Sequence, residues 1–324
     1  MSINTKKKIA VLRGGPSSEH GISLASGQNV INSLDRNLFT PIDIYIDREG
    51  AWHEGGVRTA PQTAMIFADF AFVALHGEYG EDGAVQKILN DIGMKHTGSD
   101  SFSSKLAMDK HTTKILLERE GIKMPKSYIV RTYDTDYEKK LADIWRKEHN
   151  KLIVKPNGSG SSVAVYLATN YTDLVKSVKN ILGKGHHALI EEHIEGKEVS
   201  ASVVEGMRGE RHYVPIPSHI KHNGIIFDNI TKKSSKYSVV PMKNFSQAER
   251  EVVTRTAKHI HSVLGLKDYS TSDFIINNRG IYFLEVNTLP GLTPNSILPQ
   301  ALLNSGISMK DFLTHVIGGV GDAK

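Results

Sequence analysis

Ten residues near the end of the chain read Tyr282-Phe283-Leu284-Glu285-Val286-Asn287-Thr288-Leu289-Pro290-Gly291. The pattern predicts a β-strand that carries a carboxylate and an amide on one face, because side chains two residues apart share a face, and that ends at the Pro-Gly pair. Upstream, Ser272 to Ile276 predicts a second strand, and Asn277 to Gly280 predicts the turn of an antiparallel hairpin. Counted back from this turn, Asp273 lies opposite Glu285.

This hairpin predicts a metal site. Like charges that face each other across a hairpin destabilise it, so Asp273, Glu285 and the amide oxygen of Asn287 indicate a bound hard cation. Mg²⁺ fits best, because it takes one or two protein carboxylates and completes its shell with water and nucleotide phosphates. The alternative is an edge whose acidic residues face water. The alignment of Asp273 and the adjacent Pro-Gly break favour the metal site.

Length and composition limit the class of protein. A chain of 324 residues that is 39% apolar can bury a substantial core and suits two or three domains. The absence of cysteine excludes disulfides, thiolate nucleophiles and Cys-ligated zinc. A net charge of +5, spread along the chain, favours small anionic substrates over nucleic acid.

Two segments of the sequence bear on targeting and membrane insertion. Lys6-Lys7-Lys8 is followed by only four apolar residues, so no signal peptide is predicted. The most apolar stretch, Ala64 to Leu75, is too short to span a bilayer and contains Asp69. A cytoplasmic protein with no membrane partner is therefore expected.

The first hundred residues predict a small parallel α/β domain. Its strands are expected at Ile9 to Leu12, Ile42 to Ile46 and Phe72 to Leu75, and its helices at Ser23 to Leu34 and Glu81 to Ile92. A second, α+β domain is expected from 101 to 184, with helices at Ser103 to Glu120, Asp134 to Glu148 and Thr172 to Leu182, and strands at Lys151 to Lys155 and Val163 to Ala168.

The third predicted domain, residues 185–324, follows a hinge at Gly183-Lys184-Gly185. It is expected to hold the hairpin, two terminal helices, a helix at Gln247 to Leu264, and strands at Ala188 to His193, Glu198 to Val204 and Tyr213 to Ile216. The long polar loop His222 to Met242 predicts a lid, because loops of this length in compact proteins are usually lids or disordered.

Candidate phosphate-binding residues lie in the middle of the chain. Pro156 to Ser162 is a small-residue loop whose amides can wrap phosphate oxygens, with Lys155 before it as a counter-charge. It lacks the order of a Walker A loop, and a plain turn is the alternative. Lys110 lies on a predicted helix and is a further candidate, with a solvated surface lysine as the alternative. Glu191 and Glu192 are candidates too, with an exposed acidic pair as the alternative.

Six motifs in order resemble the ATP-grasp superfamily, and within it the D-alanine–D-alanine ligase family, over almost the whole chain. They are Val11 to Glu19 with Ile22-Ser23-Leu24, Ala74 to Gly77 with Gly80 to Gly83, Thr97-Gly98-Ser99, Ala107 to Lys110, Lys155-Pro156 with Gly160 to Val163, and Glu285 to Thr293. The resemblance implies an ATP-grasp fold: a Rossmann-like parallel α/β domain, a central α+β domain with a phosphate flap, and a C-terminal α+β domain.

The resemblance also implies a ligand set. ATP would lie between the second and third domains, with Lys110, Lys155 and Ser162 at its phosphates. Glu191, Glu192, Ile194 and Glu198 would hold its adenine end. Asp273, Glu285 and Asn287 would hold Mg²⁺, with Mn²⁺ as an alternative and two ions expected.

The implied reaction joins two D-alanines through an acyl phosphate for peptidoglycan precursors, and a homodimer is expected. Phosphorylation gives the poorly electrophilic carboxylate a leaving group. Glu19 would pair with the first substrate's ammonium, the backbone of Gly291 would contribute to the oxyanion site, Ser296 would bind the second carboxylate, and Ser161 would help close the flap. His76 belongs to the same wall, with a packed histidine as the alternative.

Two departures from the family pattern bear on substrate choice. The family's strand carries an arginine two residues before the metal aspartate, where this chain has Thr271. In the long loop, a Lys-Tyr pair usually closes over the site. Here Lys232 is followed by Lys233 in place of the tyrosine, and Tyr237 would substitute if the register shifts.

Three functions therefore remain open from the sequence: a D-alanine–D-alanine ligase, which is favoured, a ligase of the same fold that uses D-serine, D-lactate or another amine as second substrate, and a nucleotide-binding protein with impaired catalysis. An oxidoreductase is not favoured, since Arg13-Gly14-Gly15-Pro16 lacks the G-x-G-x-x-G spacing.

Overall fold

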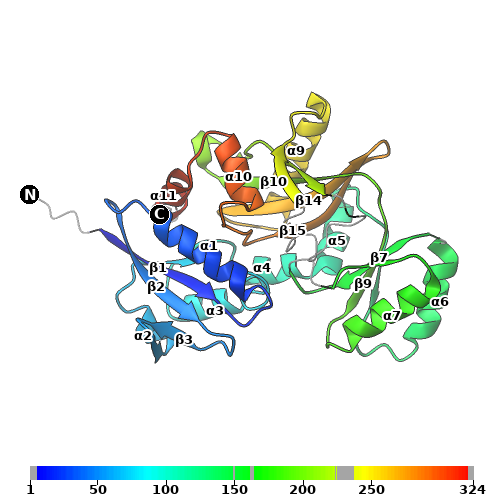
Figure 1. Ribbon diagram of the computed structural model, residues 1–324, viewed down its shortest axis with the longest axis horizontal. Helices are drawn as coiled ribbons and strands as arrows, with labels where there is room; N and C mark the ends of the chain where they lie inside the picture. The colour runs from blue at the N-terminus through cyan, green and yellow to red at the C-terminus, as the bar shows by residue number, and fades with distance from the viewer. Residues whose placement is uncertain (1–5, 149, 161–163, 223, 225–236, 320–324) are drawn as a thin grey trace, which may run out of the picture.

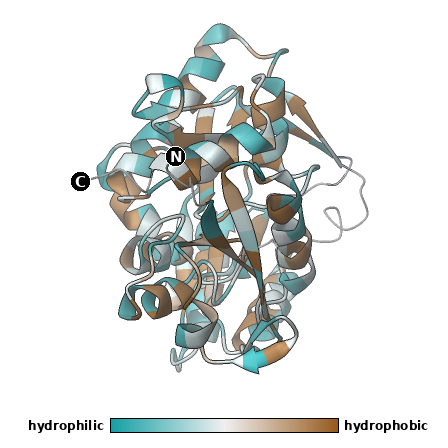
Figure 2. Ribbon diagram, turned by 90° about the vertical axis from the view of Figure 1, so that its left-hand side faces the viewer, coloured by the Kyte–Doolittle hydropathy of each residue, from teal (hydrophilic) through white to brown (hydrophobic). Residues whose placement is uncertain are grey.

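The computed structural model describes residues 6–148, 150–160, 164–222, 224 and 237–319. The chain folds around three β-sheets, which Figure 1 shows in blue, in green, and in light green to orange. Figure 2 shows hydrophobic segments along inner strands and a mixture of hydrophobic and hydrophilic segments along the helices around them. Within the described ranges, no helix combines the length and apolar character that a bilayer crossing needs.

The first sheet has the strand order β4-β3-β2-β1-β5. The strands β1 (Lys7–Gly14), β2 (Phe39–Ile46) and β5 (Phe70–Val73) are parallel, as the sequence predicts. The strands β3 (Trp52–Glu54) and β4 (Val57–Thr59) extend the sheet as an antiparallel hairpin that the sequence analysis did not predict. The apolar run Ile9 to Leu12 is fully buried, which is typical of a central parallel strand covered on both faces.

The helices of this part are α1 (His20–Ser33), α2 (Pro61–Ala64) and α3 (Ala84–Asp91). Helix α1 begins three residues earlier than predicted. Helix α3 begins three residues later than predicted, because Glu81 belongs to a turn in which its backbone N–H donates to the carbonyl of Gly77.

The single helix predicted at Ser103 to Glu120 is wrong. The structure has two helices, α4 (Ser101–Met108) and α5 (Lys110–Arg119), separated by Asp109. The Asp109 backbone leaves the helical region with φ −78° and ψ 89°, and its carboxylate accepts a hydrogen bond from the Thr112 N–H at 3.0 Å. This N-cap satisfies an end group of α5 and makes Lys110 the first residue of the new helix.

The second sheet is antiparallel, with the order β6-β9-β7-β8. Its strands are β6 (Ser127–Val130), β7 (Leu152–Pro156), β8 (Tyr166–Ala168) and β9 (Ala188–Glu192), and helices α6 (Tyr137–Glu148) and α7 (Tyr171–Leu182) share their apolar core with it. Strand β9 pairs with both β6 and β7, although it follows the predicted boundary at residue 184. The division into three domains at residues 100 and 184 remains a prediction.

The third sheet has the order β13-β12-β10-β14-β15, with β11 also paired to β10. Its strands are β10 (Lys197–Glu205), β11 (His212–Tyr213), β12 (Ser218–His222), β13 (Tyr237–Pro241), β14 (Tyr269–Asn277) and β15 (Gly280–Asn287). The strand predicted at Tyr213 to Ile216 is wrong beyond Tyr213, where the strand ends. A 3-10 turn, η1 (Met207–Gly209), precedes β11.

Helices α4, α5 and α9 (Gln247–Val263) contribute to the core of this third sheet. The two terminal helices, α10 (Ile297–Asn304) and α11 (Met309–Gly319), join the core of the first sheet instead. Figure 1 accordingly shows α11 beside α1. The end of the chain thus fastens the first sheet to the third.

Candidate active site

A cavity of about 1010 Å³ is lined by residues on or next to all three sheets. Its walls bring together residues that the sequence places far apart. Among the predicted site residues, it is lined by Glu19, His76, Lys155, Glu191, Glu192, Ile194, Glu198, Thr271, Asp273, Glu285, Asn287, Gly291 and Ser296. Lys110 reaches the same place through its ion pair with Glu285.

The predicted pairing of Asp273 with Glu285 across the β14–β15 hairpin is confirmed. The register shifts immediately after Asp273, at an irregularity of the kind that re-aims side chains next to active sites. Asn287 Nδ2 donates to Asp273 Oδ2 at 3.3 Å, and Ser200 Oγ donates to Asp273 Oδ1 at 2.5 Å. The hairpin therefore gathers carboxylate and amide groups, whose oxygens are the ligands that Mg²⁺ prefers.

Two lysines approach this acidic group from other elements. Lys110 Nζ lies 3.7 Å and Lys155 Nζ 3.8 Å from Glu285 Oε2. Lys110 lies at the start of α5 and Lys155 on β7. The fold brings these two lysines together, and their spacing in the sequence does not predict it. The result is a patch of alternating charge suited to a polyanion and its cation.

A buried chain of ion pairs holds Lys155 in place. Lys155 Nζ lies 2.8 Å from Glu191 Oε2, and Lys114 Nζ lies 2.5 Å from Glu191 Oε1. Burial alone would raise the pKa of Glu191, but the two lysines outweigh it and lower that pKa. Burial opposes the charge of Lys155 as well, yet Glu191 and Glu285 raise its pKa. Both groups are therefore charged at neutral pH.

Sequence analysis missed Lys114, whose pKa is lowered chiefly by burial against the opposing pull of Glu191. It follows Lys110 by four residues on α5, so the two share a helix face. That spacing is the one signal in the sequence that pointed to it. The exposed acidic pair considered for Glu191 is excluded, because its side chain is buried.

The start of the small-residue loop Pro156 to Ser162, called the phosphate loop below, is hydrogen-bonded to α5. Lys110 Nζ donates to the carbonyl of Ser159 at 2.7 Å, and Asn157 Oδ1 accepts from the His111 N–H at 2.8 Å. Ser161 and Ser162, and Lys232 and Lys233 of the long loop, lie outside the described residues. Tyr237 begins β13 and lines the cavity.

Glu19 immediately precedes α1 and lies against two glycines. A Cβ added at Gly160 would stand 2.7 Å, and one at Gly77 2.8 Å, from Glu19 Oε2. The absence of side chains at these positions lets the phosphate loop, the turn after β5 and the Glu19 carboxylate approach one another.

His76 connects the segment after β5 of the first sheet to the loop after β15. Its Nδ1 donates to the carbonyl of Leu289 at 2.8 Å, and its Nε2 accepts from Ser26 Oγ at 2.8 Å. Ser26 Oγ in turn accepts from the Leu292 N–H at 3.1 Å. Burial lowers the pKa of His76 despite the nearby Glu19, so the imidazole is neutral and serves this hydrogen-bond chain. Both bonds fit a packed histidine that positions the loop.

Glu81 was not predicted as a site residue, although it lies within one of the six motifs and lines the cavity. Its Oε2 accepts from the Gly77 N–H at 2.8 Å and its Oε1 from the Leu289 N–H at 3.2 Å. Burial, together with the charge of Glu19, raises its pKa to about 8. Through its bond to Leu289, Glu81 holds the same loop as His76.

Gly291 and Ser296 lie next to each other at the end of that loop. A Cβ at Gly291 would stand 2.8 Å from Ser296 Oγ, so glycine leaves room for the hydroxyl. The hydroxyls of Ser296 and Thr293 are 2.7 Å apart, and Ser296 is the N-cap residue of α10. A helix N-terminus and a backbone N–H close together favour anionic groups.

Residues predicted for the adenine end form another wall. Ile194 is buried in a small cluster with Ile275 and Tyr282. Glu192 pairs with Arg279 at 3.3 Å, and Glu198 with His222 at 3.3 Å. An apolar patch with polar groups at its margin is typical of a site for a planar ring.

The chain matches two family models. The model described as "D-ala D-ala ligase N-terminus" matches residues 8–66, and that described as "D-ala D-ala ligase C-terminus" matches residues 116–318. The D-alanine–D-alanine ligase of Carboxydothermus hydrogenoformans is 32% identical over 317 residues, which cover 96% of this chain and 97% of the relative. That of Flavobacterium johnsoniae is 32% identical over 322 residues, covering 96% and 98%.

Solved structures agree with this match. The D-alanine–D-alanine ligase from Bacillus anthracis complexed with ATP has a TM-score of 0.77 and 27% identity, covering 97% of each chain. The VanG D-Ala:D-Ser ligase from Enterococcus faecalis has a TM-score of 0.82 and 28% identity, covering 98% of this chain and 100% of the other. With the family models spanning most of its length, this chain belongs to the D-alanine–D-alanine ligase family and has the ATP-grasp fold.

Proposed function

We propose that this protein uses ATP to join two molecules of D-alanine and so supplies a dipeptide for peptidoglycan precursors. The observation that carries the proposal is the convergence of Asp273, Glu285, Lys110 and Lys155 on one cavity. This arrangement suits phosphoryl transfer, in which catalysis rests on positioning and on offsetting negative charge. The names of the curated relatives and of the solved complex with ATP support the same activity.

Lys110, Lys155 and Ser162 would bind the nucleotide phosphates, and Glu191, Glu192, Ile194 and Glu198 would hold the adenine end. Glu191 acts largely through Lys155, because their buried pair fixes the ammonium where a phosphate would meet it. Because this ammonium is already oriented, less of the free energy of phosphate binding is lost in ordering the lysine side chain.

Asp273, Glu285 and Asn287 fit a hard divalent cation, since their carboxylate and amide groups lie on one hairpin beside the lysines. They would hold Mg²⁺, with Mn²⁺ as an alternative and two ions expected. When bound, the metal offsets negative charge on the transferring phosphoryl group. The protein's own contribution is to keep the carboxylates facing the cavity, as the bond from Ser200 to Asp273 does.

In the proposed reaction, a carboxylate oxygen of the first D-alanine attacks the γ-phosphorus of ATP, and ADP leaves. The amine of the second D-alanine then attacks the resulting acyl carbon, and inorganic phosphate leaves from a tetrahedral intermediate while the amine loses a proton. Glu19 would pair with the first ammonium, the Gly291 N–H would face the developing oxyanion, and Ser296 would bind the second carboxylate. Ser161 would help close the flap.

His76 and Glu81 act on this chemistry as positioning residues. They bind Leu289 and, through Ser26, Leu292, and thereby fix the loop that contains Gly291. Oxyanion donors need such preorganisation to be effective. Lys232 and Thr271 remain proposed substrate contacts, and Thr271 lines the cavity with its hydroxyl 2.7 Å from that of Ser202.

The acceptor is tested by measuring phosphate release from ATP and Mg²⁺ with D-alanine as donor against D-alanine, D-serine and D-lactate, with product masses determined. The proposal expects D-alanyl-D-alanine as the preferred product. Preference for another acceptor would point to a pocket reshaped around Thr271. ATP binding without any product would favour the nucleotide-binding alternative.

We further propose that the enzyme is a cytoplasmic homodimer that takes small-molecule substrates. The three domains proposed for it span 1–100, 101–184 and 185–324. Precedent in the family supports the dimer, and sedimentation of the purified protein tests it.

A further inference from the structure

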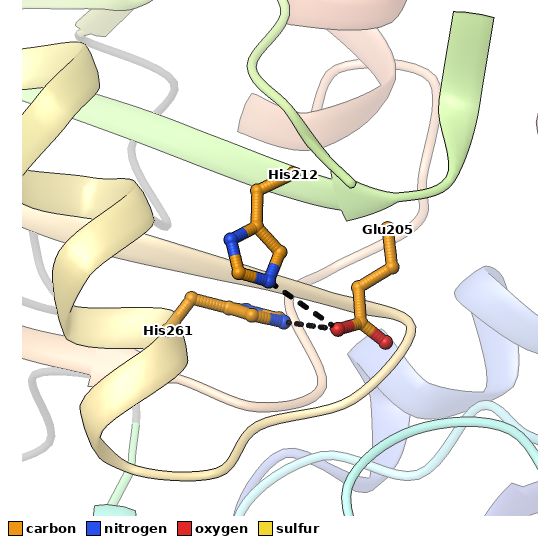
Figure 3. Close-up of side chains that lie close together, drawn as sticks. All are labelled: Glu205, His212 and His261. Carbon is orange, nitrogen blue, oxygen red and sulfur yellow. Dashed lines mark ion pairs between the residues drawn. The ribbon is translucent and has the colours of Figure 1, made fainter. Parts of the chain in front are cut away.

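Three side chains with metal-binding groups meet at the far end of the third sheet. Glu205 is the last residue of β10, His212 begins β11 and His261 lies in the last turn of α9. Figure 3 shows both imidazole rings directed at the Glu205 carboxylate. The Nε2 atoms of His212 and His261 each lie 3.6 Å from Glu205 Oε1, and one donor atom from each of the three residues lies within 4.8 Å of the others.

Hydrogen bonds within the group do not account for this arrangement. A separation of 3.6 Å is too long for a hydrogen bond. His261 is 0% exposed, and across the described part of the chain its Nε2 has no hydrogen-bond partner. A buried polar atom without a partner is costly, so this nitrogen, aimed at a carboxylate, points to a ligand.

Neighbouring groups fix the orientation of two of the ligands. His261 Nδ1 lies 2.8 Å from Ser270 Oγ, and the Asp268 N–H donates to Glu205 Oε2 at 3.0 Å. A proton on Nδ1, donated to Ser270, leaves the lone pair of Nε2 directed at the cluster. Metal-binding histidines typically donate their other N–H in this way.

We propose that Glu205, His212 and His261 bind a divalent transition-metal ion, Zn²⁺ by their chemistry, with water as the fourth ligand. Bonds of about 2.0–2.1 Å in a tetrahedron place donor atoms about 3.4 Å apart. The two separations of 3.6 Å are close to this value. Imidazole ligands favour Zn²⁺ over Mg²⁺ or Ca²⁺, which prefer oxygen ligands.

Charged side chains near the cluster act both for and against a cation. Glu205 supplies a carboxylate whose Oε1 faces the Nε2 atoms of both histidines. Arg211 and Lys258 oppose a cation, although Lys258 is paired with Glu210 at 2.8 Å.

This site is separate from the active site. None of its three residues lines the large cavity, and Glu205 lies five residues along β10 from Ser200, or about 16 Å at the rise of a strand. The metal would join the β10–β11 turn to the end of α9. It would therefore stabilise the third sheet without taking part in turnover.

The experiment uses the full chain, freed of metal with a chelator and kept in excess Mg²⁺ so that the proposed catalytic site is occupied. Titration with Co²⁺ reports coordination through visible absorption, and Zn²⁺ competition against a chromophoric chelator reports affinity. The variants are Glu205→Gln and His212→Gln. His259→Gln is the matched control, since this exposed histidine lies two residues before His261 on α9 and pairs with Glu120.

We expect one Co²⁺ per chain with an intense tetrahedral spectrum, lost in both ligand variants and kept in the control. Ser270→Ala should weaken Zn²⁺ binding by about 10- to 100-fold, as loss of an orienting partner does. Zn²⁺ should raise the unfolding midpoint of the wild type and not that of His212→Gln, with turnover unchanged in both. Absence of stoichiometric binding by the folded wild type, or equal binding by His212→Gln, would overturn the proposal.

Discussion

Lys155 and Glu191 form a buried ion pair, with Nζ and Oε2 2.8 Å apart, and this pair holds the lysine beside Glu285. Glu191 is paired on its other oxygen with Lys114, so this buried carboxylate pairs with two lysines. One of them faces the cavity. The geometry gives a fixed positive charge where the proposed nucleotide phosphates would bind.

Replacing Lys155 or Lys110 by Met should therefore weaken ATP binding more than D-alanine binding. Hydrogen bonds to charged groups contribute about 1.5–3 kcal/mol, which corresponds to roughly 10- to 100-fold in affinity. Nucleotide titration of each variant measures the effect. Lys179→Met on α7 is a suitable control, because that exposed lysine pairs with Glu138 away from the cavity lining. Unchanged ATP affinity in both variants would refute the assignment.

Ser296→Ala should raise the KM for the second D-alanine at least several-fold and leave ATP affinity unchanged. The substitution removes the hydroxyl that lies beside Gly291 and bonds to Thr293, but keeps the start of α10. Thr293→Val, which removes the partner hydroxyl alone, should have a smaller effect. Steady-state rates over a wide range of D-alanine concentration, fitted with one KM for each site because the same compound fills both, separate the acceptor site from the donor site. Equal KM values in wild type and Ser296→Ala would remove Ser296 from the acceptor site.

The raised pKa of Glu81 predicts that the free energy of unfolding depends on pH. Its pKa is about 8 in the folded protein and near its ordinary 4.5 when unfolded. The folded state therefore keeps a proton that the unfolded state releases, and stability present below pH 4.5 is lost as pH rises through about 8. Glu81→Gln, which stays neutral, should lose less stability over this window, with a difference in slope of up to about 1.4 kcal/mol per pH unit.

Urea unfolding of wild type and Glu81→Gln at several pH values between 5 and 8 measures this difference. Asp268, whose pKa burial raises to about 7, is present in both proteins, so its contribution cancels in the difference between their unfolding free energies. Parallel curves would show that Glu81 is already ionised in the folded protein.

Thr271→Arg tests the departure from the family pattern. Removing one oxyanion donor costs about 10²- to 10³-fold in kcat, so restoring one should raise the rate. The side chain is buried but lines the cavity, which offers the longer residue a direction in which to extend. Thr271→Leu controls for size without charge. If Thr271→Arg folds and binds ATP but is no faster with any acceptor, another group already donates to the oxyanion. A slower variant would indicate a pocket reshaped around the threonine.

Local patterns in the sequence predict much of the fold and part of the candidate site. The hairpin register that opposes Asp273 to Glu285 follows from counting residues from a turn, and the parallel strands β1, β2 and β5 follow from short apolar runs. These features depend on neighbours in the chain. The assignments of Lys110 and Glu19 came from motif resemblance instead, since a lone lysine or glutamate has no distinguishing spacing.

Other features depend on contacts that no local pattern encodes. The helix predicted at Ser103 to Glu120 breaks because Asp109 caps α5 and bonds to Asn157, 48 residues away. Lys114 is important only because Glu191 arrives from β9. His212 and His261 are 49 residues apart in the sequence, and their meeting at Glu205 is set by the packing of α9 on the third sheet.

The most direct test compares product formation by wild type and Glu285→Gln at saturating ATP, Mg²⁺ and D-alanine. Glu285→Gln keeps the shape of the side chain but removes a charge from the proposed metal site, and Glu251→Gln on exposed α9 surface is its control. We expect wild type and control to form one D-alanyl-D-alanine per phosphate released, and Glu285→Gln to be slower by at least about 100-fold while still folded. A wild-type enzyme that releases phosphate without dipeptide, or a Glu285→Gln variant with wild-type turnover, would contradict the account.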